Sequence, residues 1–354
     1  MSKIAILGHG VVGSGTAEVF FKNKDSISNK LGRDVDIKHI LDLRDACEFA
    51  DSPYSGSFTK DFEVILNDPE VTVAAELIGG TEPAYSYVKA LLTAGKSVVT
   101  SNKELVAKKG AELLKIAAEK NVSFFFEASV GGGIPIIRPL QQCLSADSIN
   151  EIVGILNGTT NFILTKMFRD DMAFDEALKL AQEYGYAERD PSDDVNGVDA
   201  CRKICILASM IFGKRVNPDD VLCEGITTLT KEDIEFCESR GGTCKLIARA
   251  VKIGDKAMVT VCPAFVSKDN QLAGVSDVYN AIMVRGEATG DVVFYGKGAG
   301  KYPTASAVVN DIANALASKA AGGISPLSWS DDVQVLSEPV FSGVHGNIKM
   351  FEGL

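Results

Sequence analysis

The stretch IAILGHGVVGSGTAEVFF (residues 4–21) decides the fold of the first part of the chain. Four apolar residues precede the glycine-rich turn GHGVVG, and an apolar-periodic segment follows it. This order predicts a strand, a tight turn and a helix. In such a turn the first glycine permits the bend, the second lets the backbone approach a pyrophosphate, and the third lets the helix pack closely on the strand. The candidate phosphate-binding residues are Gly8, Gly10, Val11, Val12 and Gly13.

The segments that follow alternate between strand and helix patterns. Short apolar runs predict strands at Asp36–Leu43, Val71–Ile78, Ser97–Thr100 and Val122–Glu127. Helices are predicted at Pro83–Ala94, with Thr81 as its N-cap, and at Ala107–Glu119. Strands that alternate with helices predict an α/β, doubly wound (Rossmann-type) parallel sheet with helices on both faces. We expect this domain to span residues 1–130, completed by a helix near residues 303–320.

The pattern changes after Gly131. Strands are predicted at Ile152–Leu156, Lys245–Lys252, Ala257–Val266, Ala281–Glu287 and Val292–Tyr295, and helices at Asn161–Arg169, Phe174–Tyr184 and Val198–Phe212. Turn residues between the later strands favour an antiparallel, α+β second domain over residues 131–302. Residues 321–354 are left as a C-terminal tail, and no element is predicted for Ser337–Leu354.

The composition excludes several classes of protein. A net charge of −11 without a basic cluster argues against nucleic acid or an anionic membrane as the partner. No apolar run reaches the roughly 18 to 20 residues that span a bilayer, and the N-terminus lacks the features of a signal peptide. Eight cysteines form no CxxC pair and only three histidines accompany them, so no zinc-site spacing occurs. The cysteine usage fits a reducing cytoplasm and argues against a Cys–His catalytic pair.

An acidic residue near the end of the second predicted strand bears on the choice of dinucleotide. Asp42 can hold a ribose 2′-hydroxyl and would repel a 2′-phosphate, which favours NAD. Arg44 lies two residues farther on and could accept the 2′-phosphate of NADP. Asp42 also lies farther from the glycine turn than is usual. The sequence therefore leaves the preference between NAD and NADP open.

The segment YGYAERDPSDDVNGVDACRK (residues 184–203) crowds five carboxylates ahead of a lysine. Asp199 and Lys203 are four residues apart, so they share one face of the apolar helix that follows. Burying both charges costs several kcal/mol unless they are paired or used. A structural ion pair at a helix entrance is the simpler interpretation, and a pair of site residues is the alternative.

Three other polar features are unusual for their positions. Lys103 follows a short strand of the first domain, at the sheet edge where open α/β sheets bind ligands, although a solvated lysine would also fit. Glu127 enters a loop with three glycines, where a carboxylate and backbone carbonyls could hold a hard cation. The turn NGTTN (residues 157–161) opens a helix and could grip a carboxylate or hydroxyl group.

Taken together, these pieces resemble the successive signatures of the homoserine dehydrogenase family. They are GHGVVG, TSNKELVA, FEASVGGGIPII, LNGTTNFIL, YGYAERDPSDDVNGVDACRK and GKGAGKYPTASAV, and they cover residues 4 to about 312 in the family's order. The resemblance implies reversible, NAD(P)-dependent reduction of L-aspartate-4-semialdehyde to L-homoserine, in the biosynthesis of threonine and methionine. It implies that the second domain binds substrate, carries the catalytic residues and forms a homodimer.

The resemblance also implies roles for individual residues. Lys203 matches the proton donor and acceptor at the substrate oxygen, and Lys103 matches a lysine near both nicotinamide and substrate. A buried lysine beside a second ammonium can have its pKa lowered toward neutrality, which suits proton transfer. The other matches are Glu188, Asp199, Gly158, Thr159 and Tyr186 for substrate, Gly300 for cofactor, and Glu127 with backbone oxygens of Val130, Gly132 and Ile134 for sodium. The remaining acidic residues of the 184–203 segment are expected to cap the loop.

Two rival functions remain at this point. Another semialdehyde dehydrogenase, aspartate-semialdehyde dehydrogenase, would need a nucleophilic cysteine with a histidine, and none of His9, His39 and His345 lies in a segment suited to that role. A dinucleotide-sensing regulator would need the glycine turn but neither Lys103 nor Lys203. Many family members carry a C-terminal regulatory ACT domain of ~80 residues, and we expect none here, so that threonine inhibition through such a domain is not expected.

Overall fold

The computed structural model describes residues 2–45, 48, 51–321, 327–330 and 332–354. Two compact units are present. The first contains the described residues up to Gly133 together with Ala299–Ser330, and the second contains Ile134–Gly298 together with the described residues from 332 to the end. The chain thus returns to the first unit after completing most of the second. Cys47 and residues 322–326 of the predicted tail lie outside the described residues.

The described part of the first unit contains a six-stranded sheet, which is parallel as predicted. One of its strands, the two-residue β3, was not predicted. Its strands follow the order β3-β2-β1-β4-β5-β6. Their bounds are β1 (Ser2–Leu7), β2 (Val35–Leu41), β3 (Phe58–Thr59), β4 (Val71–Glu76), β5 (Ser97–Thr100) and β6 (Phe124–Phe125). The strand order reverses direction between β1 and β4, and the carboxyl ends of these two strands mark the switch point where doubly wound sheets bind ligands.

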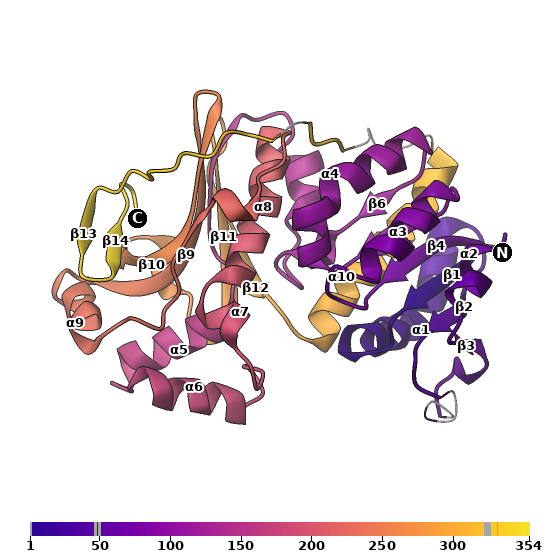
Figure 1. Cartoon of the computed structure of the whole chain (residues 1–354), viewed down its shortest axis with the longest axis horizontal. Coiled ribbons are helices and arrows are strands. Elements are labelled where there is room, and N and C mark those ends of the chain that lie inside the picture. Colours follow the sequence, from indigo (N-terminus) through magenta and orange to yellow (C-terminus); the bar gives the residue numbers. More distant parts are fainter. Residues whose placement is uncertain (1, 46–47, 49–50, 322–326, 331) are drawn as a thin grey trace. The chain divides into compact units, whose positions relative to one another are not determined.

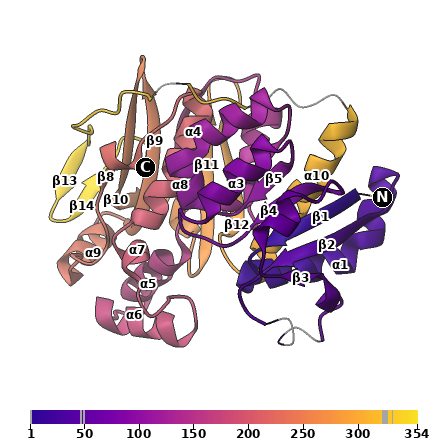
Figure 2. The ribbon, with the colours of Figure 1, turned by 45° about the vertical axis from the view of Figure 1, so that its right-hand side comes forward.

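Helices cover both faces of this sheet (Figures 1 and 2). Their bounds are α1 (Val11–Leu31), α2 (Phe62–Leu66), α3 (Ala84–Thr93), α4 (Lys103–Glu119) and α10 (Lys301–Ala321). Helices α1 and α10 pack side by side although most of the chain separates them in sequence. Their buried side chains form one core with residues such as Ile4, Ile6 and Val73 of the sheet. Helix α10 contains the late segment, residues 303–320, that was expected to complete the sheet domain.

Three local predictions in the first unit are wrong. Thr81 does not cap α3, because the helix begins at Ala84 with Pro83 as the N-cap residue, while the Thr81 hydroxyl donates to Glu104 Oε1 at 3.1 Å. Helix α4 begins four residues earlier than predicted, at Lys103, because the Asn102 side chain caps it. Glu127 does not end a strand; β6 is only two residues long, and Glu127 opens a short 3₁₀ turn, Glu127–Ser129.

The second unit is built on a mixed sheet of eight strands within the described part of the chain, with the order β12-β11-β7-β9-β10-β14-β13 and β8 beside β10. The strands are β7 (Ile149–Ile155), β8 (Leu222–Cys223), β9 (Gly242–Ile253), β10 (Lys256–Ser267), β11 (Tyr279–Gly286), β12 (Gly290–Lys297), β13 (Gly343–His345) and β14 (Ile348–Met350). Only the β8 and β14 pairings with β10 are parallel, so the predicted antiparallel α+β character holds for the main strands.

Five helices accompany that sheet in the described residues. They are α5 (Gly158–Arg169), α6 (Phe174–Glu183), α7 (Ser192–Val195), α8 (Val198–Phe212) and α9 (Lys231–Ser239). Helix α8 has the predicted bounds and packs on β7, β9 and β10. Short α7 and helix α9 were not predicted; α9 begins at a capping box in which Thr230 and Asp233 bond each other's backbone N–H groups.

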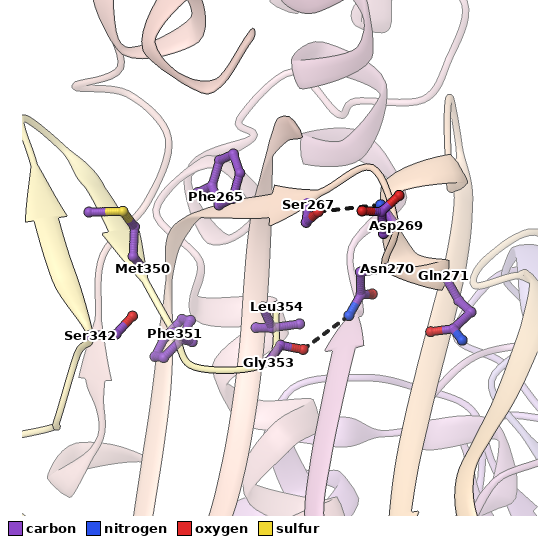
Figure 3. Close-up of a pocket in the computed structure, with 10 residues that line it drawn as sticks. All are labelled: Phe265, Ser267, Asp269, Asn270, Gln271, Ser342, Met350, Phe351, Gly353 and Leu354. Atoms are coloured by element: carbon purple, nitrogen blue, oxygen red, sulfur yellow. Dashed lines mark hydrogen bonds between the residues drawn. The ribbon is translucent and has the colours of Figure 1, made fainter. Parts of the chain in front are cut away.

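The C-terminal segment, for which no element was predicted, joins the second unit. Strand β14 pairs with β10, and Phe351 lies under the Arg249 guanidinium, whose central carbon is 4.7 Å from the ring centroid. The Leu354 carbonyl accepts a hydrogen bond from Ser267 N at 3.0 Å. A hollow of about 450 Å³ lies between this segment and the end of β10. Figure 3 shows its lining side chains, among them Phe265, Asn270, Met350 and Phe351. None of the predicted site residues lines it.

No helix of the described residues combines the length and the apolar character needed to cross a bilayer.

Candidate active site

Lys203 and Asp199 form a buried ion pair on the first two turns of α8. Lys203 Nζ donates to Asp199 Oδ2 at 2.7 Å and to the carbonyl oxygen of Leu156 at 2.8 Å. The two side chains are 9% and 3% exposed. Gly197, the residue just before the helix, has a φ of 81°, which favours glycine, and the apolar remainder of the helix anchors the pair against the sheet. The predicted four-residue spacing therefore brings these two groups together at the end of β7.

Asn157 connects this pair to a second carboxylate. Its Oδ1 accepts a hydrogen bond from Thr160 N at 2.8 Å and so caps α5, while its Nδ2 donates to Asp199 Oδ2 at 2.8 Å and to Asp194 Oδ1 at 2.7 Å. Burial, and secondarily the nearby Asp199 charge, raise the pKa of Asp194. The cluster holds two carboxylates and one ammonium. That charge balance favours a ligand with a positive group.

Asp194 is a candidate site residue that the sequence interpretation did not select, since it was assigned to loop capping. It belongs to α7, and its carboxylate points at Asn157 instead of a backbone terminus. The only signal in the sequence was its position five residues before Asp199. One acidic residue among several in the same loop gives no indication that it will contact Asn157.

Among the other predicted substrate residues, Gly158 and Thr159 begin α5 and Tyr186 contacts this helix. The Thr159 hydroxyl donates to the Tyr186 carbonyl at 2.7 Å, which ties the helix to the 184–191 loop. Gly158 has no space for a side chain, because a Cβ there would lie 2.8 Å from the Val278 carbonyl oxygen. Tyr186 is 45% exposed and stacks edge-on against Phe162. Glu188 is exposed, and only its backbone carbonyl has a hydrogen bond among the described contacts, from Gln182 Nε2 at 3.2 Å.

Asn280 is a further polar residue that the sequence interpretation did not select. It is 1% exposed, and neither side-chain atom of its amide has a hydrogen-bond partner among the described residues. Its Nδ2 would lie 2.1 Å from a Cβ added at Gly298, so glycine is required there. Asn is depleted in strand interiors, so an Asn inside the apolar run of β11 was a signal available from the sequence.

The glycine turn has the geometry that its motif predicts. Gly8 has a φ of 94°, and a Cβ there would meet the Leu77 carbonyl oxygen at 2.9 Å. A Cβ at Gly13 would lie 1.9 Å from the Gly8 carbonyl oxygen, so any larger residue would push the helix off the strand. Nothing lies within 4 Å of a Cβ added at Gly10, which leaves the backbone open to a ligand at the N-terminus of α1. Val11 and Val12 are the first two helical residues.

Asp42 and Arg44, the two predicted determinants of dinucleotide choice, bond each other at the edge of this turn. Arg44 Nε lies 2.9 Å from Asp42 Oδ1, and Arg44 Nη2 lies 2.9 Å from Asp42 Oδ2. Asp42 also accepts His9 N at 2.9 Å, and Arg44 donates to the His9 carbonyl at 2.7 Å. The Arg44 guanidinium, followed by the backbone donors, holds the pKa of Asp42 well below its usual range. The carboxylate is therefore ionised at neutral pH.

Lys103 and Gly300 lie at the N-terminal ends of two helices of the first unit. Lys103 is the first residue of α4, directly after the buried cap residue Asn102. Gly300 has a φ of 120° just before α10, and its carbonyl accepts Thr304 N at 3.1 Å. The first unit thus contains the glycine turn, Asp42, Arg44, Lys103 and Gly300, and the second contains Lys203 and its neighbours.

Comparison with known proteins gives both halves of the chain the same assignment. The NAD-binding domain of homoserine dehydrogenase matches residues 8–127, and the homoserine dehydrogenase domain matches residues 135–313. The homoserine dehydrogenase of Bacillus subtilis is 44% identical over 312 residues, which are 88% of this chain and 72% of that protein. The crystal structure of a homoserine dehydrogenase from Thiobacillus denitrificans has a TM-score of 0.90 at 37% identity, covering 95% of this chain and 79% of that one.

The chain belongs to the homoserine dehydrogenase family. A hyperthermophilic archaeal homoserine dehydrogenase mutant, solved in complex with NADPH, matches with a TM-score of 0.76 at 30% identity, covering 89% of this chain and 97% of that one. The family membership makes this chain an NAD(P)-dependent oxidoreductase, as the sequence interpretation predicted. Both rival functions are set aside by the family assignment.

The glycine loop after Glu127 has the donor chemistry for a hard cation. Glu127 is 6% exposed, and its backbone N donates to Asp311 Oδ2 at 2.9 Å. Gly131 and Gly132 have φ values of 74° and 53°, which let successive carbonyls turn away from an extended path. One carboxylate with backbone carbonyl oxygens suits sodium better than zinc. No cluster of three or more His, Cys, Asp or Glu side chains suited to a metal ion occurs in the described part of the chain.

Proposed function

We propose that this homoserine dehydrogenase interconverts L-homoserine and L-aspartate-4-semialdehyde with Lys203 as the proton donor and acceptor. The observation that carries this assignment is the buried Lys203 ammonium, fixed by Asp199 at 2.7 Å and by the Leu156 carbonyl at 2.8 Å. A lysine ammonium carries three N–H donors, which suits the delivery of a proton to a substrate oxygen.

The chemistry requires such a group. Reduction of the aldehyde places a developing negative charge on its oxygen, and a cationic donor beside that oxygen stabilises the transition state and then supplies the proton. Oxidation of the alcohol runs through the same contacts in reverse, so the lysine then accepts the hydroxyl proton. NAD(P) supplies or receives the hydride when it is bound. Asp199 orients Lys203 during both the reduction of the aldehyde and the oxidation of the alcohol.

The substrate ammonium is assigned to the carboxylates of Asp199 and Asp194. Asp199 and Asp194 are held in place by the Asn157 amide, and both are buried or nearly so, which strengthens their attraction for a cation. Glu188, on the exposed 184–191 loop, is assigned to the same ammonium, and Gly158, Thr159 and Tyr186 are assigned to the rest of the amino acid. Glu188 would have to turn inward when substrate binds, because its side chain is exposed without it.

The cofactor residues are assigned to the first unit. The open backbone at Gly10 and the N-terminus of α1 suit the pyrophosphate, and Asp42 with Arg44 suits the adenosine ribose. Lys103 and Gly300 are assigned to the nicotinamide end. Sodium is the cation assigned to Glu127 and the carbonyls of Val130, Gly132 and Ile134, where it would order the loop without entering the chemistry.

We also propose that the chain forms a homodimer through the second unit and acts in the cytoplasm. Sedimentation of the purified chain measures the mass of the assembly and so tests the dimer. The activity is tested by a spectrophotometric assay of L-homoserine with NAD and NADP in turn, with sodium, potassium or tetramethylammonium as the only monovalent cation. We expect reduction of at least one cofactor, without any need for phosphate, and a higher rate in sodium than in tetramethylammonium. A protein that bound either dinucleotide but reduced neither with homoserine would contradict the assignment.

A further inference from the structure

A buried carboxylate at the end of β4 takes no part in the chemistry described above. Glu76 is fully buried at 0% exposure and is the last residue of the strand. It pairs in register with Leu7, the last residue of β1, so it lies at the point where the strand order reverses. Burying a carboxylate in this position is unfavourable unless it is fully hydrogen-bonded. Burial raises the pKa of Glu76, and its hydrogen-bond donors oppose that effect.

One carboxylate oxygen holds the loop that follows β4. Glu76 Oε1 accepts Ile78 N at 2.8 Å and Gly79 N at 3.3 Å. Gly79 and Gly80 both have positive φ values, 86° and 69°, so the loop would have many accessible conformations without these bonds. The loop also packs against the glycine turn: a Cβ added at Gly8 would lie only 2.9 Å from the Leu77 carbonyl oxygen.

The other oxygen connects the same loop to the start of α4. Glu76 Oε2 accepts the Thr100 hydroxyl at 2.6 Å, and that hydroxyl in turn accepts Asn102 N at 2.9 Å. The Asn102 side chain then closes the circuit, since its Nδ2 donates to the Gly80 carbonyl at 2.6 Å while its Oδ1 caps α4 at Leu105 N. Lys103 directly follows this cap residue and is the first residue of α4, so the cap fixes the position of its backbone.

We infer that Glu76 is a positioning residue of the nucleotide site: its buried carboxylate fixes the Ile78–Gly80 loop and, through Thr100 and Asn102, the backbone that carries Lys103. The loop and the glycine turn stand at the carboxyl ends of β4 and β1, the two sides of the switch point at which such sheets bind dinucleotides. The inference rests on the proposed use of the first unit for NAD(P). It assigns Glu76 to the nicotinamide end, because the adenosine end has its own determinants in Asp42 and Arg44.

Glu76→Gln tests this with little change in shape. The glutamine can keep one acceptor oxygen for Ile78 N, but its NH₂ group would face the Thr100 hydroxyl and remove that hydroxyl's acceptor. Binding of NADH and of ADP-ribose, which lacks the nicotinamide, is measured by calorimetry. We expect the variant to bind NADH about tenfold more weakly and ADP-ribose within about twofold of wild type. The matched control is Glu112→Gln, at a half-buried glutamate of α4 that pairs with Lys89 of α3, and it should change neither affinity.

Thr100→Val provides an independent variant should Glu76→Gln fold poorly. It removes the hydroxyl between Glu76 and Asn102 and should reproduce the selective loss of NADH affinity. Because both side chains belong to one circuit, the double variant should lose less than the product of the two single losses. Thr100→Ser keeps the hydroxyl and should restore NADH binding.

Equal weakening of NADH and ADP-ribose, or a fall in melting temperature with both affinities unchanged, would overturn the inference. These binding measurements need no turnover. If the wild-type chain binds both ligands and oxidises no homoserine, the proposed reaction fails while the assignment of Glu76 is still decided by the ratio of the two affinities.

Discussion

Asn157 Nδ2 lies 2.8 Å from Asp199 Oδ2, the same oxygen that accepts Lys203 Nζ at 2.7 Å. One carboxylate oxygen thus accepts hydrogen bonds from the Lys203 ammonium of α8 and from the amide that caps α5. Because the oxygen is shared, the residue that caps α5 also helps to fix the position of Lys203. Changes at Asn157 should therefore appear in both stability and catalysis.

Asn157→Ala should lower the free energy of unfolding by about 1 kcal/mol, the usual effect of losing an N-cap. It should also reduce kcat/KM for homoserine by at least about tenfold, because Asp199 and Asp194 lose the amide that holds them apart. Thr230→Ala removes the cap of α9 and is the control: a similar loss in urea unfolding with unchanged kinetics. If both variants behaved alike in the kinetic assay, Asn157 would be a cap and nothing more.

Asp194→Asn should weaken homoserine binding while stabilising the fold at neutral pH. Burial raises the pKa of Asp194 above its unfolded value, so the folded chain holds this proton more readily than the unfolded chain between the two values. Stability from this group is present at low pH and is lost as pH rises through the folded pKa. Urea unfolding from pH 3.5 to 8 should show the variant gaining on wild type as pH rises. A constant difference across that range would refute the electrostatic explanation.

Lys245 should make stability depend on pH in the opposite direction. It is 3% exposed, donates to the Val275 carbonyl at 2.5 Å, and burial lowers its pKa to about 8. Between about pH 8 and its unfolded value the unfolded chain binds more protons, so this group adds stability as pH rises. Wild type should therefore gain stability relative to Lys245→Met between pH 8 and 10 in chemical denaturation. Parallel curves for the two proteins would show that the lysine is not titrating there.

Arg44→Ala should shift the dinucleotide preference toward NAD. The substitution removes the guanidinium that balances the ionised Asp42 carboxylate, which would then repel a 2′-phosphate without compensation. We expect the KM for NADP to rise about tenfold more than the KM for NAD, a difference of one strong charge-assisted hydrogen bond. Asp42→Ala is the reciprocal variant and should change the ratio in the other direction. Equal changes in both KM values would exclude this pair from cofactor discrimination.

Much of this architecture follows from local patterns in the sequence. The strand, glycine turn and helix at residues 4–21 were predictable because Gly8 and Gly13 are each required by a close backbone contact. Helix α8 was predictable because apolar residues fill its buried face and glycines end it on both sides. The pairing of Asp199 with Lys203 followed from helical spacing alone.

The features that were missed depend on distant contacts. The β14 strand has no strong pattern of its own and exists because β10 offers an edge to pair with. Asp194 and Glu76 resemble many acidic residues in sequence, and only their hydrogen bonds with Asn157 and Thr100 distinguish them. The Thr81 cap failed because Pro83 sets the start of α3. Propensity describes a residue's own preferences, whereas these roles are set by the neighbours that the fold supplies.

The turnover of Lys203→Ala tests the central claim most directly. The variant is compared with wild type and with Lys179→Ala, a change at an exposed lysine on α6, in homoserine oxidation and in dinucleotide binding. If Lys203 transfers the proton, kcat should fall by about 10²–10⁴ in Lys203→Ala alone, with the affinity for NAD(P) near that of wild type. A Lys203→Ala enzyme with near-normal kcat would contradict the account.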